Sequence, residues 1–433
     1  MNSKVQKITI IGAGIAGLSA AYELKKAGLE VEVFEKNPYP GGRMSTDNSK
    51  TFPFDRGADF MIDKWYSLLE SFSKELNIPW ILSEDKSRHR VMRDGIPRYI
   101  DVVGPLSIFN FDVLPLRARF SFLLLLIKII ILHSNLNFFD LSKNSTAYDK
   151  SSAHDYLVKH VGQDISDYVA DPFTSIMQFH RADEISVGAL FALLSEMIKF
   201  KGFRVSYTSG GMGEIPKALA KYVGNIHYET ITKSITEFSS DAIIIATPAH
   251  EAEMIDGIPI EAKSYLSQVK YASTSTVSFC IPCTMFSDNT HLTYVPFVEN
   301  KIIAGYDNTI RKDIQNQNEG RSIINVYLHE YSTDIYKNMN DAELFDFVKK
   351  ELLLVCPEAK ENAEEIEPYM ICRLPMAMPK FTGVHVSATR KFLSEFQGKN
   401  NIYFAGDYLN SPWAEGAARS GQRVAKLIIA KNS

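Results

Sequence analysis

The fold of this chain is decided by residues 8–35, which read ITIIGAGIAGLSAAYELKKAGLEVEVFE. Ile8–Ile11 is apolar and β-branched and predicts a strand. Leu18–Lys26 predicts a helix, and Val31–Phe34 predicts a second strand. A strand, a helix and a strand in this order form a βαβ unit, whose two strands are parallel. The sequence therefore predicts an α/β fold that is built on a parallel sheet.

Three glycines and one acidic residue indicate that this unit binds a nucleotide. Gly12, Gly14 and Gly17 form a G-x-G-x-x-G motif between the first strand and the helix. Glycines there allow a tight turn and the close approach of a pyrophosphate, and the start of the helix offers unpaired N–H groups. Glu35 follows the second strand, where a carboxylate accepts hydrogen bonds from ribose hydroxyls and repels a 2′-phosphate. We therefore expect an unphosphorylated adenosine such as that of FAD or NAD.

The composition excludes several classes of protein. The 433 residues include 45% apolar side chains, which is typical of a globular protein of two or three domains. The net charge is −4 and no basic run occurs, which argues against a nucleic-acid partner. Four cysteines are too few for a disulfide scaffold, and we find no export signal and no apolar segment long enough to span a membrane. We expect a cytoplasmic protein.

Further motifs lie downstream of the first unit. They are Gly41-Gly42-Arg43, Phe54–Asp59, Ser209–Gly213, Tyr403–Tyr408 and Glu415–Gly421. Together with the glycine motif, these segments resemble the FAD superfamily that contains protoporphyrinogen oxidases, carotenoid desaturases and flavin amine oxidases. The resemblance spans the chain and is dense in the cofactor-binding segments.

The resemblance implies FAD as the cofactor. No metal is expected, because the single C-x-x-C motif at Cys280 and Cys283 supplies only half of a tetrahedral site. The resemblance also implies that the backbone of Ile231 holds the adenine and that Asp407 lies near the pyrophosphate and ribitol. The amides around Gly416 and Ala417 are expected to face the flavin's pyrimidine edge, where negative charge accumulates on reduction. The expected cofactor-binding residues are Gly12, Gly14, Ile15, Ala16, Gly17, Glu35, Lys36, Gly42, Arg43, Gly57, Ala58, Asp59, Ile231, Gly406, Asp407, Ala414, Gly416 and Ala417.

The resemblance also implies an architecture. A Rossmann-like FAD-binding domain of the GR2 type is expected to be discontinuous and to comprise residues 1–80, 204–268 and 395–433. An α+β substrate-binding domain is expected to be inserted twice, as residues 81–203 and 269–394. Independently of the resemblance, the spacing of apolar residues predicts a mostly helical stretch from about Asp63 to Phe203. The active site is expected in the cleft between the domains.

Two segments of the expected substrate domain favour one chemistry. Residues 178–186 and 373–381 resemble segments of protoporphyrinogen oxidases and related desaturases. They favour removal of a hydride from an apolar, ring-containing or polyunsaturated small molecule to flavin N5, which creates a double bond. Because the chain has one dinucleotide motif, we expect oxygen or a quinone to accept the electrons. The resemblance leaves the substrate's identity and the oligomeric state open.

Two aromatic residues favour a different reaction. Tyr403 and Trp413 occupy the places where flavin amine oxidases set two aromatic walls around an amine, and both are candidates for facing the substrate. The strand Thr274–Ser278 lacks the Lys that those oxidases carry near flavin N5. His180 and His385 are candidate bases, although a lone histidine is more often structural. Further alternatives are a flavin-free binding protein like the Rab GDP-dissociation inhibitors and a non-redox isomerase on reduced flavin.

One segment has an unusual apolar run. Pro115–His133 includes the run Phe122–Leu132, which is too short to span a membrane, together with Arg117, Arg119 and Lys128. The alternatives are a buried core helix, the wall of an apolar substrate tunnel and a peripheral contact with the inner face of a membrane. All three stay open at the level of the sequence.

Overall fold

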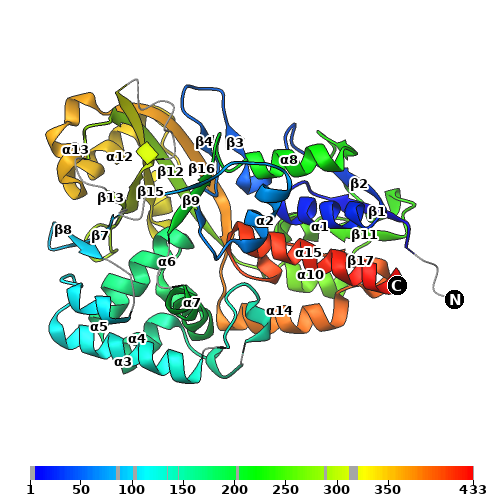
Figure 1. Cartoon of the computed structure of the whole chain (residues 1–433), viewed down its shortest axis with the longest axis horizontal. Coiled ribbons are helices and arrows are strands. Elements are labelled where there is room, and N and C mark those ends of the chain that lie inside the picture. The colour runs from blue at the N-terminus through cyan, green and yellow to red at the C-terminus, as the bar shows by residue number, and fades with distance from the viewer. Residues whose placement is uncertain are drawn as a thin grey trace.

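The molecule has two lobes, and each lobe contains its own sheet (Figure 1). The first and last helices lie side by side in the lobe that holds the parallel sheet. The larger sheet lies in the other lobe, beside a group of helices. The computed structural model describes residues 5–83, 88–100, 105–133, 135–144, 146–200, 204–286, 290–311 and 320–432.

Five parallel strands form the first sheet, in the order β10-β2-β1-β11-β17. They come from the beginning, the middle and the end of the chain. The strands are β1 (Lys7–Ile11), β2 (Glu30–Phe34), β10 (Ile226–His227), β11 (Ala242–Ile245) and β17 (Ile402–Phe404). The helices of this lobe include α2 (Ser67–Glu75), α8 (Glu214–Val223), α9 (Ala249–Glu253), α10 (Ile260–Leu266) and α14 (Gly383–Phe396). The expected α/β class with a parallel sheet is confirmed.

The helices α1 (Ile15–Lys26) and α15 (Trp413–Asn432) pack against each other in this lobe. They are in close contact at Gly421, where an added Cβ would lie 2.0 Å from the carbonyl oxygen of Ala16. A side chain at position 421 would therefore push the two helices apart. The contact joins the two ends of the chain.

Seven strands form the larger sheet, in the order β16-β12-β15-β14-β13-β7-β8. All neighbouring pairs are antiparallel except β13 and β7. The helix α12 (Asp341–Val355) packs on this sheet, and a capping box between Asn340 and Glu343 fixes its start. The strands are β7 (Arg88–Arg93), β8 (Ile96–Ile100), β12 (Tyr271–Pro282), β13 (Thr290–Tyr294), β14 (Ile303–Asn308), β15 (Arg321–Leu328) and β16 (Glu367–Pro379).

A group of helices completes the second lobe. It comprises α3 (Leu116–Leu132), α4 (Ala153–His160), α5 (Gln163–Ile165), α6 (Asp171–Met177) and α7 (Val187–Lys199). Most of α7 is buried, and α3 packs against it with one face. In the part of the chain that the structure describes, no helix combines the length and the apolar character needed to cross a membrane.

Several short strands and helices complete the fold. Two strands pair as β3 and β4, and three more form a sheet in the order β5-β9-β6. These strands are β3 (Thr46–Asp47), β4 (Phe54–Asp55), β5 (Met61–Ile62), β6 (Trp80–Leu82) and β9 (Val205–Thr208), and the remaining short helices are α11 (Thr333–Tyr336) and α13 (Pro357–Glu361).

One expectation about the first insertion needs correction. The spacing of apolar residues predicts a mostly helical stretch from Asp63 to Phe203, but residues 88–100 within it form the hairpin β7–β8 at the edge of the larger sheet. The strand pattern is hidden by Arg90, which is buried beside Val91 and forms an ion pair of 2.6 Å with Glu358. The domain boundaries themselves stay a prediction.

The substitution Gly421→Ala tests the contact between α1 and α15. The added methyl group has no room beside Ala16, so we expect a loss of about 1–3 kcal/mol in the free energy of unfolding, measured by chemical denaturation. The control is Gly14→Ala, because a Cβ at Gly14 meets nothing within 4 Å. Equal stabilities for the two variants, measured without cofactor, would contradict the tight contact.

Candidate active site

A cavity of about 1000 Å³ lies where the two lobes meet. The residues that follow strands β1, β2, β11 and β17 line one part of it. Residues of β15, β16 and the end of α6 line another part. The cavity thus lies at the carboxyl ends of the parallel strands, where α/β sheets bind their ligands.

The three glycines of the first motif have three different surroundings. Gly12 has a φ of +104°, and a Cβ there would lie 2.9 Å from the carbonyl oxygen of Ala246. A Cβ at Gly17 would lie 2.0 Å from the carbonyl oxygen of Gly12, so Gly17 lets α1 pack on the turn. Gly14 alone faces open space, on the side that lines the cavity. A ligand can therefore approach the backbone at Gly14.

Glu35 lies at one end of the cavity, next to this turn. Its Oε2 accepts a hydrogen bond from the amide of Ala13 at 2.7 Å. Its Oε1 accepts from the amide and the side chain of Asn37, at 2.9 and 2.7 Å. Ile231 and Lys36 line the same end, and Lys36 forms an ion pair with Glu251 at 2.7 Å. This end offers an anchored carboxylate and an apolar side chain.

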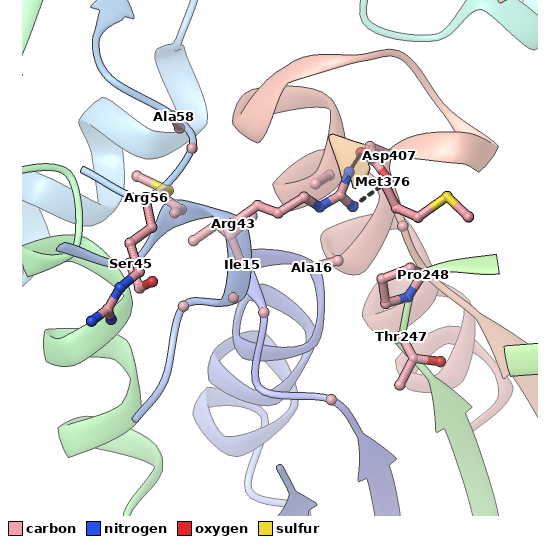
Figure 2. Close-up of a pocket in the computed structure, with 18 of the residues that line it drawn as sticks. Ile15, Ala16, Arg43, Ser45, Arg56, Ala58, Thr247, Pro248, Met376 and Asp407 are labelled. Carbon is pink, nitrogen blue, oxygen red and sulfur yellow. Dashed lines mark hydrogen bonds and ion pairs between the residues drawn. The ribbon is translucent and has the colours of Figure 1, made fainter. Parts of the chain in front are cut away.

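Two residues that line the cavity, Arg43 and Asp407, form an ion pair (Figure 2). The guanidinium Nη1 lies 2.8 Å from Oδ2 of Asp407, and Nη2 donates to Oδ1 at 3.1 Å. Nη1 also donates to the carbonyl oxygen of Ala377 on β16 at 2.7 Å. Burial is the largest influence and lowers the pKa of Arg43, but the facing carboxylate of Asp407, together with Tyr271 and Glu251, raises that pKa overall. The guanidinium of Arg43 therefore contacts both lobes, through Asp407 in one and Ala377 in the other.

The segment that follows β4 runs past Arg43. The amide of Ala58 donates to the carbonyl oxygen of Arg43 at 2.9 Å, and a Cβ at Gly57 would lie 2.3 Å from that oxygen. Asp59 comes next, and its Oδ2 accepts hydrogen bonds from Tyr327 at 2.9 Å and from Asn325 at 3.3 Å, both on β15. Asp59 therefore connects this segment to the sheet of the other lobe.

Two helices begin at the cavity. Ile15 and Ala16 start α1, and Ala414 and Ala417 lie in the first two turns of α15; all four line the cavity. Helix N-termini carry unpaired N–H groups and a partial positive charge, which suit a bound anion. Gly416 faces away, because a Cβ there would lie 2.2 Å from the hydroxyl of Ser411.

Glu415, between these alanines, does not face the cavity. Its carboxylate accepts hydrogen bonds from the amides of Leu68 and Leu69 at the start of α2, at 3.0 and 3.1 Å. Arg419 donates to it at 2.7 Å. Burial raises the pKa of Glu415, although Arg419 and the amide hydrogen bonds oppose this rise. Glu415 fixes α15 against α2.

Another end of the cavity is apolar and aromatic. Trp413 lines it, and its indole Nε1 donates to the carbonyl oxygen of Met177 at 2.7 Å. Phe179 (φ 62°) and Trp413 (φ 80°) are the aromatic residues with a positive φ among the described residues. Such a conformation is strained for a bulky side chain, and strain of this kind concentrates at functional sites. The side chains at this end include Phe60, Ile62, Tyr66, Ile176, Met177, Phe179, Met378 and Trp413.

Three residues that the sequence analysis considered do not line the cavity. One was a candidate for facing the substrate, and two were candidate bases. Tyr403 lies in β17 with 1% of its surface exposed, within the core. His385 is buried, and its Nε2 donates to the carbonyl oxygen of Tyr408 at 2.9 Å. Burial lowers the pKa of His180 and of His385 to about 4, so both are neutral at pH 7. Their places correct the assignment of Tyr403 and favour structural roles for both histidines.

Most of the expected cofactor-binding residues line the cavity, and two do not. Gly17 and Gly416 shape the walls through close packing without lining the cavity. The remaining sixteen residues of the expected set all line it: Gly12, Gly14, Ile15, Ala16, Glu35, Lys36, Gly42, Arg43, Gly57, Ala58, Asp59, Ile231, Gly406, Asp407, Ala414 and Ala417. Within the described ranges, no group of three or more His, Cys, Asp or Glu side chains is placed to hold a metal ion.

Cys372 is a cavity residue that the sequence analysis missed. Its thiol donates to the carbonyl oxygen of Arg56 at 3.2 Å. Burial raises the pKa of this thiol to about 11, which keeps it protonated at pH 7. A protonated thiol is a poor nucleophile, so Cys372 contributes packing to the wall.

Comparisons with known proteins give the site a context. The chain is 28% identical over 185 residues to protoporphyrinogen oxidase 2, chloroplastic/mitochondrial, of Arabidopsis thaliana, which covers 42% of this chain and 34% of that protein. It is 40% identical over 114 residues to 1-hydroxycarotenoid 3,4-desaturase of Flavobacterium sp. (strain P99-3), which covers 25% of this chain and 22% of that protein. The matches thus span about a third or less of these two relatives.

A solved structure is similar over the whole chain. Cyclohexylamine oxidase from Brevibacterium oxydans IH-35A has a TM-score of 0.74 at 17% identity, with 99% of each chain covered. At this identity the likeness concerns the fold. The family described as flavin containing amine oxidoreductase matches residues 15–429, which include every segment on which the resemblance rests downstream of the first turn. The chain therefore belongs to the family of flavin-containing amine oxidoreductases, whose members are flavin-dependent oxidoreductases.

Proposed function

We propose that this protein is an FAD-dependent oxidoreductase that removes a hydride from an apolar, ring-containing or polyunsaturated small molecule. The observation that carries this proposal is a single cavity with two chemically different ends. One end has the features of a nucleotide site, around Gly14 and Glu35, and the other is an apolar chamber around Phe179 and Trp413. A cofactor held at the first end reaches toward a substrate held at the second.

The residues of the nucleotide end fit FAD. Gly14 leaves room beside the start of α1 for a pyrophosphate, and Glu35 is held by Ala13 where it can accept from ribose hydroxyls. Ile231 is exposed toward the same end and offers an apolar surface for the adenine. When bound, the flavin supplies the capacity to accept two electrons.

The apolar chamber holds and shields the substrate. Its aromatic and aliphatic walls exclude water, which favours an apolar molecule and strengthens electrostatic interactions inside. Trp413 is fixed by its hydrogen bond to Met177, so it can orient a flat substrate against the cofactor. The start of α15, at Ala414 and Ala417, is placed to stabilise negative charge that accumulates on the cofactor.

Oxidation of an amine is the second candidate reaction. Trp413 favours it, since it provides one aromatic wall of the kind that flanks an amine, and the name of cyclohexylamine oxidase describes such a reaction on a ring-containing amine. The position of Tyr403 weighs against it, because this side chain lies in the core and provides no second wall. In both candidate reactions the flavin would accept the hydride.

We propose oxygen or a quinone as the electron acceptor, because the cavity serves a single dinucleotide motif. The partial similarity to a protoporphyrinogen oxidase and to a carotenoid desaturase supports an oxidation in general, without choosing the acceptor. Peripheral contact with a membrane is part of the same proposal, and the exposed face of α3 supports it.

The experiment that tests the proposed function is the visible spectrum of the purified protein, followed by anaerobic mixing with candidate substrates. Three classes should be mixed separately: protoporphyrinogen, carotenoid precursors and amines. We expect bleaching of a flavin spectrum by one of the first two classes. Bleaching by amines alone would favour the second candidate. A colourless protein that cannot take up FAD would favour a flavin-free binding protein, and conversion without net oxidation would favour an isomerase.

The substitution Glu35→Ala tests the nucleotide end. Loss of the ribose hydrogen bonds should weaken FAD affinity by at least roughly tenfold, because each charge-assisted hydrogen bond contributes about 1.5–3 kcal/mol and about 1.4 kcal/mol corresponds to a tenfold change. FAD affinity is measured by titrating the apoprotein. Glu32→Ala is the matched control, since Glu32 lies on the same strand, contacts His227 and is not part of the cavity wall. Unchanged affinity in Glu35→Ala would remove Glu35 from the site.

The substitution Trp413→Ala tests the apolar end. We expect turnover to fall by roughly a hundredfold while flavin content stays near that of the wild type, because the substrate loses its orienting wall. Tyr403→Phe is the matched control, since the hydroxyl of Tyr403 has no hydrogen-bond partner among the described residues and lies outside the cavity. If both variants turn over at the wild-type rate, Trp413 does not face the substrate.

A further inference from the structure

The helix α3 exposes an unusually large apolar surface. Leu124 and Ile131 are 63% and 70% exposed, respectively. The exposed residues at 116, 120, 124, 127 and 131 recur at intervals of three or four and therefore share one face. The exposed apolar side chains of this helix are Leu116, Phe120, Leu124, Ile127, Ile130, Ile131 and Leu132. The opposite face packs in the core through Ala118, Phe122, Leu125, Leu126 and Ile129.

The position of α3 makes this face available. It lies at the outer edge of the helical group, remote from the parallel sheet (Figure 1). Its side toward the protein is covered by α7 and by the segment before α3. Monomeric proteins rarely expose contiguous apolar patches of this kind without an interaction partner.

The charges on α3 indicate which partner. The helix contains Arg117, Arg119 and Lys128 and no acidic residue, whereas the whole chain has a net charge of −4. Arg119 is turned back to the carbonyl oxygens of Leu114 and Phe109, at 2.7 and 2.6 Å. Arg117 is exposed, and Lys128 donates to the hydroxyl of Tyr156 at 2.8 Å. An apolar face with basic residues at its border is complementary to anionic lipid.

A second copy of the chain is a poorer partner for the same face. If two copies of α3 paired antiparallel about a two-fold axis, Arg117 of one would approach Lys128 of the other. If they paired in parallel, each basic residue would approach its own counterpart. Both arrangements bring like charges together, which is unfavourable in a largely apolar interface.

The length of α3 fits a helix that lies on a membrane. Its 17 residues span about 25 Å at 1.5 Å per residue. That is shorter than the ~30 Å hydrocarbon core, and the opposite face of α3 is packed against the protein. A helix of this kind lies in the plane of the interface, with its apolar side chains among the acyl chains and its basic side chains near the headgroups.

We infer that α3 docks this protein on the surface of a bilayer that contains anionic lipid. Leu116, Phe120, Leu124, Ile127 and Ile131 enter the outer part of the acyl layer, while Arg117 and Lys128 contact the headgroups. The inference deepens the peripheral membrane contact that is part of the proposed function. It rests on the surface of α3 and not on the cavity, so vesicle binding and turnover test the two parts of that proposal separately.

Flotation with lipid vesicles tests the inference on the full-length protein. The vesicles contain either phosphatidylcholine alone or phosphatidylcholine with phosphatidylglycerol, and the protein is compared with Leu124→Glu/Ile131→Glu. We expect wild-type binding to the anionic vesicles, reduced by added salt, and at least tenfold weaker binding by the double variant. Leu354→Glu on α12 is the matched control, because Leu354 is 72% exposed on another helix and its variant should bind like the wild type.

Three outcomes would overturn the inference. They are absence of wild-type binding to the anionic vesicles, equal binding by the double variant, and equal loss in Leu354→Glu. Circular dichroism confirms that each variant is folded, and light scattering reports the oligomeric state without lipid. A wild-type dimer that the double variant dissociates, together with no vesicle binding, would assign the face to a second copy instead.

Discussion

The close contact between backbone atoms around the first turn is the constraint on which the cavity depends. Gly12 touches the end of β11 at Ala246, and Gly17 touches Gly12 itself. Gly421 then brings α15 against the start of α1 at Ala16. Each approach is closer than a Cβ allows, so β1, β11, α1 and α15 converge within a small space. The carboxyl ends of two strands and the starts of two helices thereby meet at one cavity.

This convergence determines the electrostatics of the site. Arg43 and Arg56 line the cavity, but each is paired with a carboxylate, Asp407 or Asp47. A bound diphosphate would therefore be met chiefly by N–H groups and the partial charges of helix starts. Such groups are fixed by the fold and need no rearrangement when charge arrives. The ion pair of Arg43 instead holds the loop after β17 and the strand β16 in place.

The nucleotide half of the site could be predicted because its information is local. Gly12, Gly14, Gly17 and Glu35 lie within one βαβ unit, and the spacing of the motif reflects the geometry of one turn. The orientation of Tyr403 could not be predicted in the same way. It lies on a strand buried on both faces, with Tyr403 in one core and Phe404 in another, so hydrophobicity does not reveal which way either points.

Other features depend on contacts between distant residues. The strand β7 contains the buried Arg90, whose partner Glu358 lies 268 residues away, so the local pattern does not suggest a strand. The conformation of Trp413 depends on Met177, which lies 236 residues away. The positive φ of Phe179 likewise has no signal in the sequence, because a phenylalanine gives no local preference for it. The apolar end of the site is thus a product of tertiary structure.

The apolar chamber and the surface of α3 have a common physical logic. An apolar, ring-containing or polyunsaturated substrate partitions into a bilayer, where its local concentration far exceeds that in water. A quinone acceptor partitions in the same way. An oxidoreductase that docks through α3 would therefore meet both molecules at one surface. A substrate that comes from the bilayer is already out of water, so its binding in the chamber would gain little free energy from the burial of apolar surface. The affinity of the chamber would then depend on shape, which is what the fixed positions of Trp413 and Phe179 provide.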